Sequence, residues 1–543
     1  MLSVALLAAA CDDKTAADVL SSTPPVSTAD SLVTSSATPA TPAPTPSVFS
    51  PGESVLTVAI RDPATLDPMR LADPSAELVA RQLFEGLTRW DPVDEKVTPA
   101  AATSWTSTHG GREFTFHLRP GMTFHNGEPV TSEDFAFAFD RIATKSNASD
   151  LAYTLQDVQG FQATNIEGTN NHLSGLSTPD DLTLVIKLTR PYRDFPIVLT
   201  HPGLVPLLKS DVQHTTTFLS TPVGNGPFQI AQTCHPGEPM SMRSFTAFTP
   251  TPKLDGLRFL PYQDPSVSWL PFLNGAIDVA EVPSEQFKSA AQQFGDAGYQ
   301  PFLAGYYYGL NVNSPELKKP TFRKAISRAI DRSRIATRIY KGTLVPPRGI
   351  VPQGMHGFEE NQCFKLCDYS PSAARRLLNG IPKKKRKLSL SYTQGNPHGQ
   401  VARAVSKNLK AVGIKVSVKA YPFPEYLKRL KKGKQSMYRL GWIAEYPDPG
   451  AFLDALFGST SPDNHSGFAS PKVDRILHQA AAEPNGAVRI QDYKKAEQLI
   501  LKDVPIVPIG SFMTHWAAQK WVHGIVFDTT GGFDATGISI ADH

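Results

Sequence analysis

The sequence predicts a mixed α/β protein that is built from more than one lobe. At 543 residues the chain is longer than one hydrophobic core comfortably organises, so at least two lobes are expected. Segments in which apolar residues alternate with polar ones interleave with segments of helical spacing, which is typical of α/β lobes. Hydrophobic residues make up 41% of the chain and charged residues 19%, an ordinary balance for a globular protein.

The first 53 residues are expected to lie outside the folded part. Residues 1–11 are apolar and end at Cys11, and the run Leu7-Ala8-Ala9-Ala10-Cys11 resembles a lipoprotein signal cleavage box, in which Cys11 becomes the lipidated first residue. The alternative is a stray apolar N-terminus. Residues 12–53 are rich in Ser, Thr, Pro and Ala and have too little apolar surface to offset the entropy of ordering, so we predict a disordered tether.

The first half of the folded part contains clear strand and helix patterns. Alternating apolar residues predict strands at 56–60, 114–118 and 182–186. Thr131-Ser132-Glu133-Asp134 is typical of a capping box, and it predicts a helix whose buried stripe includes Phe135, Phe139 and Ile142.

The second half contains a β-α-β unit. Alternation at 388–392 is followed by helical spacing at 401–412, and Gly413 then ends the helix before a second alternating segment at 414–418. Ahead of this unit, apolar spacing predicts one helix over 321–340 with four residues facing inward, namely Phe322, Ile326, Ala329 and Ile330.

Two cysteines lie in one short loop. Cys363 and Cys367, in NQCFKLCDYS, are able to close a short disulfide in an oxidising compartment. A metal pair is the less favoured interpretation, because no second Cys or His pair lies nearby at ligand spacing. We therefore predict a disulfide and no metal site.

The stretch GREFTFHLRPGMTFHNGEPVTSEDFAFAFDR, at 111–141, closely resembles the motif of family 5 of bacterial extracellular solute-binding proteins, which are the oligopeptide-, dipeptide- and nickel-binding proteins of ABC importers. Further matching stretches follow in the family's order, and the resemblance covers about residues 54–540. They are LFEGLTRWDP, TPVGNGPFQI, FLNGAIDVAEVP, FRKAISRAIDRSRI and GWIAEYPDPGAFLDALF.

The resemblance implies a two-lobed, periplasmic-binding-protein-like fold of the large peptide-binding type. Lobe I would comprise residues 54–304 and 505–543, with an extra subdomain at about 88–187, and lobe II residues 305–504. The implied function is that of a lipid-anchored, monomeric binding protein on the extracytoplasmic face of the cell membrane. It would capture a small peptide in the cleft between the lobes and hand it to the ABC permease, with no cofactor and no catalysis.

The resemblance also implies where a peptide would bind. Glu445 matches the acidic residue that neutralises the peptide ammonium, although the oligopeptide binders have Asp there. Arg439 matches an arginine that meets the carboxylate of a shorter ligand, and Trp442 would line a side-chain pocket. The structural alternatives are a surface carboxylate, an ion-pair partner and a lobe II core residue, respectively.

Three tyrosines complete the predicted site. Tyr306 and Tyr307 lie in the run GYYYGLN, where the chain passes from lobe I to lobe II, and they combine apolar area with a polar tip. Tyr153 is a further candidate for the cleft wall. Packing in the core or within a strand is the alternative for Tyr306 and Tyr307.

Other functions find less support in the sequence. A net charge of +4 is too small to indicate nucleic acid as the partner, and the chain has no G-x-S-x-G, H-E-x-x-H or G-x-x-x-x-G-K-[ST] motif. The open alternatives are another solute on the same fold, such as a nickel chelate, haem or a glycoside, and a sensor of peptide signals. Residues 383–434 hold fifteen Lys or Arg and one acid, Glu425. They form either a solvated face or a surface attracted to anionic lipid or to an acidic patch on the permease.

Overall fold

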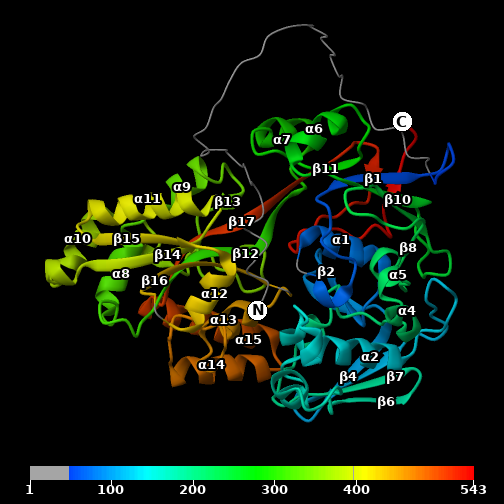
Figure 1. The fold of residues 1–543 in the computed structure, drawn as a ribbon, viewed down its shortest axis with the longest axis horizontal. Coiled ribbons are helices and arrows are strands. Elements are labelled where there is room, and N and C mark those ends of the chain that lie inside the picture. The colour runs from blue at the N-terminus through cyan, green and yellow to red at the C-terminus, as the bar shows by residue number, and fades with distance from the viewer. Residues whose placement is uncertain (1–47, 72, 396, 434, 445) are drawn as a thin grey trace, which may run out of the picture.

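The computed structural model describes residues 48–71, 73–395, 397–433, 435–444 and 446–543, and these form two lobes (Figure 1). Cys11, the predicted signal segment and the predicted tether up to residue 47 lie outside the described residues, as does Glu445. Residues 48–53 pack on lobe I, because the Arg243 guanidinium donates hydrogen bonds to the Val48 carbonyl and the Glu53 carboxylate. The last six residues of the predicted tether are therefore attached to lobe I.

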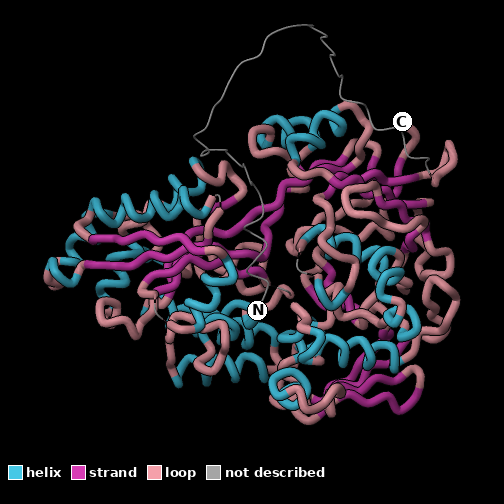
Figure 2. Tube along the Cα trace, viewed as in Figure 1, coloured by secondary structure: helices cyan, strands magenta, loops and turns pink. Residues whose placement is uncertain are grey.

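One continuous sheet runs through both lobes, as the strands in Figure 2 show. Its strand order is β15-β14-β16-β12-β17-β11-β1-β10-β9-β8. The long strands β12 (Tyr299–Leu310) and β17 (Ile506–Ala518) lie at its centre and pair with each other. Because β12 also pairs with β16 of lobe II, and β17 with β11 of lobe I, these two strands carry the chain between the lobes.

Lobe I surrounds the part of the sheet that contains β1, and its largest hydrophobic cluster joins residues from 56 to 279 with residues from 522 to 538. The N-terminal and C-terminal parts of the chain thus share this core. The sheet strands of lobe I are β1 (Val55–Ile60), β8 (Phe228–Ile230), β9 (Met240–Ser244), β10 (Gly256–Pro261) and β11 (Val279–Glu281). Its helices include α1 (Pro74–Leu83), α3 (Phe195–Val198), α4 (Lys209–Gln213), α5 (Thr215–Ser220), α6 (Pro265–Leu273) and α7 (Phe287–Phe294).

A separate antiparallel sheet in lobe I has the order β4-β5-β7-β6. Its strands are β4 (Ala102–Thr108), β5 (Glu113–Leu118), β6 (Leu176–Asp180) and β7 (Thr183–Lys187), and a hairpin of β2 (Thr88–Asp91) and β3 (Lys96–Pro99) lies ahead of it. Helix α2 (Ser132–Ala143) covers this sheet and starts with the predicted capping box between Thr131 and Asp134. Phe135, Phe139 and Ile142 are buried, as their helical spacing predicts.

Lobe II has helices on both faces of its part of the sheet, so it forms three layers. The β-α-β unit is present as β14 (Lys387–Thr393), α11 (His398–Ala411) and β15 (Lys415–Tyr421), with β14 and β15 parallel. Gly413 follows α11 with a φ of +88°, a conformation that favours glycine. The remaining elements are α8 (Pro320–Arg328), α9 (Arg332–Arg338), β13 (Leu344–Val345), α10 (Pro371–Leu378), α12 (Phe423–Lys431), β16 (Met437–Ile443), α13 (Gly450–Phe457), α14 (Pro471–Ala482) and α15 (Gly486–Asp503).

The helix predicted over 321–340 is wrong in one respect, because the structure has two helices there, α8 and α9. Asp331 caps α9 by accepting a hydrogen bond from the Arg334 amide. The Arg332 guanidinium donates to the carbonyls of Ser327 and Ile330, which occupies acceptors at the end of α8. The inward-facing residues are nevertheless buried as predicted.

Candidate functional site: a cavity between the lobes

A cavity of about 400 Å³ lies between the two lobes, within the size range of small-ligand sites. Lobe I contributes the segments around Tyr153 and Arg190, and lobe II contributes the end of β16, helix α13 and the start of α14. The aromatic and charged side chains that line it are Tyr153, Asp157, Arg190, Tyr192, Trp442, Tyr446, Asp454, Asp474 and His478. Two predicted site residues from opposite lobes, Tyr153 and Trp442, therefore meet at one cavity.

The Trp442 side chain is fixed within lobe II. It lies on β16 opposite Gly305 of β12, and its indole Nε1 donates a hydrogen bond to the Ala451 carbonyl at 2.6 Å. Because this bond holds the ring against the start of α13, Trp442 presents a rigid aromatic wall to the cavity. Ile443 and Tyr446 also line the cavity, and they flank position 445 in the chain.

Tyr306 and Tyr307 point to opposite faces of the sheet, as neighbours on a strand must. Tyr307 packs in the cluster that contains Trp442 and Leu440, on the same side as α13. Tyr306 and Tyr308 pack in the other lobe II cluster, beneath α8 and α11. Both Tyr306 and Tyr307 are buried, and neither is among the residues that line the cavity.

Arg439 belongs to the same face as Tyr306. It lies directly opposite Tyr308 in the pairing of β16 with β12, and its guanidinium lies over the Tyr306 ring at 4.5 Å from the centroid. It is only 1% exposed and does not line the cavity. The structure thus separates Arg439 and Tyr306 from Trp442 and Tyr153.

The buried polar atoms around Arg439 are incompletely satisfied. Within the described part of the chain, its Nε and Nη2 have no hydrogen-bond acceptor, and the rings of Tyr308 and Tyr340 both pack edge-on against Tyr306. The Tyr306 hydroxyl lies 3.5 Å from Nδ1 of His398, at the start of α11. We refer to Tyr306, Tyr308, Tyr340, His398 and Arg439 as the Arg439 cluster. Its excess of hydrogen-bond donors suits an anionic group.

Charged contacts between the lobes were not predicted from the sequence. In lobe I, Arg190 forms a bidentate pair with Asp157, with both N–O distances at 2.7 Å. Asp454 of lobe II faces this pair across the cavity, and burial raises the pKa of its carboxyl to about 6. No local pattern points to this group, because Asp157 and Asp454 are almost 300 positions apart in the chain and the members follow no shared motif.

The two lobes also touch directly beside the cavity. Arg489 of α15 pairs with Asp194 of lobe I. The Arg193 amide donates to the Ala481 carbonyl at 3.0 Å, and the Arg193 side chain donates to the Ala482 carbonyl at 3.1 Å. These contacts hold the carboxyl end of α14 against lobe I.

A second cavity, of about 510 Å³, lies inside lobe I beside the β2–β3 hairpin. It contains none of the predicted site residues. Most of its charged side chains pair with one another, since Arg89 pairs with Glu85 and Asp534, and Arg81 pairs with Asp528. The cavity between the lobes is therefore the stronger candidate for the ligand site.

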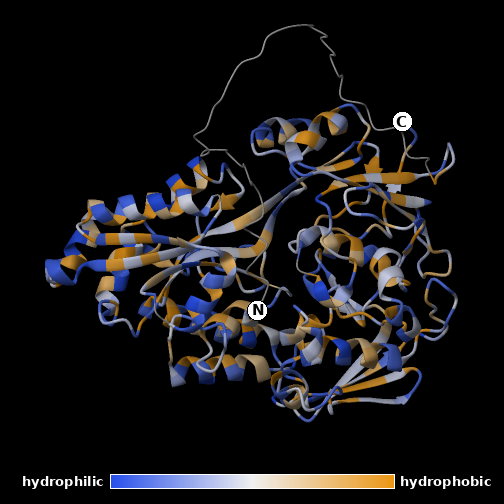
Figure 3. Cartoon of the chain, in the orientation of Figure 1, coloured by the Kyte–Doolittle hydropathy of each residue, from blue (hydrophilic) through white to orange (hydrophobic). Residues whose placement is uncertain are grey.

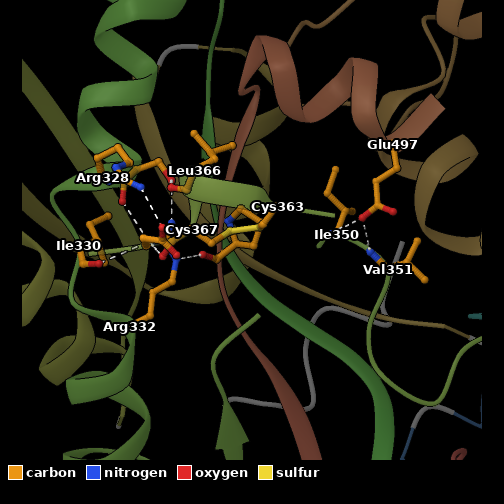
Figure 4. Close-up of a disulfide and its surroundings, with 12 residues drawn as sticks. Arg328, Ile330, Arg332, Ile350, Val351, Cys363, Leu366, Cys367 and Glu497 are labelled. Atoms are coloured by element: carbon orange, nitrogen blue, oxygen red, sulfur yellow. Dashed lines mark hydrogen bonds and ion pairs between the residues drawn. A yellow bond between two sulfur atoms is a disulfide. The ribbon is translucent and has the colours of Figure 1, made fainter. Parts of the chain in front are cut away.

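Cys363 and Cys367 form a disulfide, which Figure 4 shows together with its surroundings. The carbonyl of Cys367 accepts a hydrogen bond from Arg332 at 2.9 Å, and the Cys363 amide donates to the Arg348 carbonyl. The disulfide loop is thereby attached to the core of lobe II, away from the cavity. Among the described residues, no group of three or more His, Cys, Asp or Glu side chains is placed to hold a metal ion.

A two-lobed α/β fold with a cavity between its lobes is typical of solute-binding proteins. The model of the family "Bacterial extracellular solute-binding proteins, family 5 Middle" matches residues 96–464. The chain therefore belongs to family 5 of the bacterial extracellular solute-binding proteins.

Named relatives extend over nearly the whole chain. The oligopeptide-binding protein OppA of Bacillus subtilis is 25% identical over 89% of this chain and 92% of its own. The periplasmic murein peptide-binding protein MppA of Escherichia coli is 28% identical over 85% of this chain and 88% of its own. The unliganded open form of MppA superimposes with a TM-score of 0.76 at 25% identity, over 91% of this chain and 99% of that structure. The predicted fold class is thus confirmed.

Proposed function

We propose that the protein captures a peptide between its lobes and delivers it to the permease of an ABC importer. The observation that carries the proposal is the cavity at which Tyr153 of lobe I and Trp442 of lobe II meet, beside the segment that includes position 445. Family membership supports an extracytoplasmic solute-binding role, and the relatives OppA and MppA are named for binding oligopeptides and murein peptides. The proposal involves no catalytic step and no cofactor.

The two ends of a peptide need opposite charges. We propose that Glu445 neutralises the ammonium and that Arg439 meets the carboxylate. The unsatisfied donors of the buried Arg439 support the second assignment, since a carboxylate accepts two parallel N–H bonds from a guanidinium. The Arg439 cluster and the cavity lie on opposite faces of the sheet. This assignment therefore requires the ligand carboxylate to pass β12 in order to reach Arg439.

Ligand capture would depend on the strands between the lobes. The hydrophobic clusters support the proposed boundaries, with lobe I at 54–304 and 505–543 and lobe II at 305–504, because each main cluster falls almost wholly within one lobe. Because β12 and β17 run between the lobes in the sheet, small rotations there would open and close the cavity. A bound peptide would shift this equilibrium towards the closed form.

The remaining proposals concern location. A lipid on Cys11 and a disordered tether would hold the protein at the outer face of the cell membrane as a monomer, close to its permease. In the described part of the chain, no helix combines the length and the hydrophobicity that crossing a bilayer requires.

The test of the proposed function is the identity of the natural ligand. The protein would be purified without denaturation, its ligands released with acid, and the extract analysed by mass spectrometry. Peptides at a stoichiometric level are the expected result. A metal chelate, haem or a glycoside in their place would refute the peptide assignment and leave the family intact. If the protein binds a peptide whose uptake is unchanged in a permease knockout, the protein is a sensor of that peptide.

A further inference from the structure

A long segment of lobe II contains no acidic residue. Between Asp368 and Glu425 the chain has twelve Lys or Arg residues and no Asp or Glu. The segment comprises α10, the 3-10 helix η7 (Lys383–Lys385), β14, α11 and β15. The net charge of the whole chain is only +4, so this charge is concentrated locally.

Most of this charge collects at one end of lobe II. Lys387 and Lys415 are register partners at the start of the parallel strands β14 and β15. The Arg375 Nη2 donates to the Ala411 carbonyl at 3.2 Å, which brings the end of α10 to the end of α11. Arg386 donates to the Leu378 carbonyl at 2.8 Å and so attaches η7 to α10. We define the basic tip as Arg375, Arg376, Lys383, Lys384, Lys385, Lys387, Lys410 and Lys415.

The basic tip is exposed and its charges are not neutralised. All eight side chains belong to exposed residues, and within the described part of the chain none of them forms an ion pair. In Figure 3 the outer end of lobe II, at the left near the position of α10 and β15 in Figure 1, is strongly hydrophilic. It lies on the side of the sheet farthest from β8 of lobe I.

The architecture itself does not require so much charge. β15 is an edge strand of the large sheet, and lysines on an edge strand prevent pairing with another chain. Lys415 and Lys419 already serve that purpose on β15. The three consecutive lysines of η7 belong to no strand, and their mutual repulsion is unfavourable unless an anionic surface neutralises it.

We propose that the basic tip binds the surface of a bilayer that contains anionic phospholipid. Six of its eight residues are lysines, which are flexible point charges, and lysine is depleted at protein–protein interfaces. Diffuse, laterally mobile headgroups suit such a surface better than a fixed protein partner does. This contact is independent of the ligand cavity, and it would supply a second membrane signal beside a lipid anchor.

The test uses the full chain with Cys11→Ser, so that no lipid contributes to binding, and measures cosedimentation with vesicles. Binding is expected with vesicles of one-third phosphatidylglycerol in phosphatidylcholine at low salt, and not with pure phosphatidylcholine. It should weaken as salt rises, because screening shortens the range of the attraction to about 8 Å at physiological ionic strength. The triple variant Lys383→Gln/Lys384→Gln/Lys385→Gln should lower the partition coefficient by on the order of 100-fold.

A matched control separates the basic tip from net charge. Lys288→Gln/Lys472→Gln/Lys520→Gln removes three exposed lysines from other parts of the molecule, and it should leave the partition coefficient within about two-fold of the parent. Equal losses in both triple variants would overturn the proposal. The proposal would also be overturned if the protein did not bind anionic vesicles but bound, through the basic tip, to membranes that contain the permease. Circular dichroism would verify that both variants are folded.

Discussion

Two of the buried arginines of lobe II, Arg332 at 3% exposure and Arg439 at 1%, have different surroundings. Arg332 donates to the carbonyls of Pro508, Ser327, Ile330 and Cys367 and to the Ser327 hydroxyl, at 2.6 to 3.3 Å. Arg439 has two donor nitrogens without an acceptor in the described part of the chain. Arg332 therefore uses its donors to stabilise the fold, whereas Arg439 still has donors with which it can bind a ligand.

A buried structural charge can be distinguished from a ligand-binding charge by whether its hydrogen-bond donors find acceptors within the fold. Arg332 joins α8, β17 and the disulfide loop, so its bonds stabilise the arrangement of three segments. Arg439 stacks on Tyr306, and two of its donor nitrogens bind no acceptor in the described part of the chain. A buried donor without a partner lowers stability, and the free energy is recovered when a ligand satisfies it.

We expect the greatest loss of affinity from a change at Glu445, the proposed partner of the peptide ammonium. Glu445→Gln should weaken peptide binding by about 3–5 kcal/mol, because a buried ammonium would lose its counter-ion. Isothermal titration with the peptide recovered from the native protein measures this change. Glu425→Gln is the matched control, since Glu425 is an exposed partner of Arg429 and its loss should cost less than ~1 kcal/mol. Unchanged affinity in Glu445→Gln would refute the proposed anchor.

Removing the two arginines tests the comparison directly. Arg332→Met should lower the free energy of unfolding by at least ~3 kcal/mol, because it leaves several buried carbonyls without donors. Arg439→Met keeps a similar side-chain volume and removes none of the side-chain hydrogen bonds described above. Its effect on the free energy of unfolding should therefore be below ~1 kcal/mol in either direction. Urea denaturation measures both. Equal destabilisation would mean that Arg439 is structural as well.

The region around the disulfide loop should also respond to pH. Glu497 accepts hydrogen bonds from the amides of Ile350 and Val351, and burial raises the pKa of its carboxyl from 4.5 to about 7. Between these values the folded protein holds a proton that the unfolded chain has lost, so stability falls as pH rises. The contribution is on the order of 3 kcal/mol, fully present below pH 4.5 and lost as pH rises through 7. Glu497→Gln should remove this part of the pH dependence in denaturation series, and a variant with an unchanged series would contradict it.

The ligand role of Arg439 predicts a smaller change in affinity. Arg439→Met should weaken binding of a short peptide by about 2 kcal/mol, as expected for hydrogen bonds to a charged group. The same peptide with an amidated C-terminus should bind the parent and the variant alike. If the variant loses affinity equally for both peptides, the arginine does not contact the carboxylate.

The disulfide predicts the smallest effect. Cys363→Ala/Cys367→Ala should lower the free energy of unfolding by about 2 kcal/mol, because the closed loop is short. Peptide affinity should stay the same, since the disulfide loop is anchored to Arg332 and does not line the cavity. A loss of affinity would connect the two regions that the structure separates.

Much of the fold was accessible to local patterns. The strands at 56–60 and 114–118, the capped helix after Thr131 and the β-α-β unit ending at Gly413 all follow from residue spacing, which depends only on neighbours in the chain. The prediction of a single helix at 321–340 was wrong because distant groups, the carbonyls of Cys367 and Pro508, bind Arg332 where α8 ends and α9 begins. No local pattern contains those partners.

Residue patterns along the chain were enough to predict the family, the alternation of strands and helices, and the candidate residues in their motifs. The packed fold was needed to show that Tyr153 and Trp442 share a cavity, that Arg439 lies on the opposite side of the sheet, and that Asp157, Arg190 and Asp454 face one another. The physical reason is that a motif fixes the order of residues along one strand or helix. Which faces meet is set by packing between segments hundreds of positions apart.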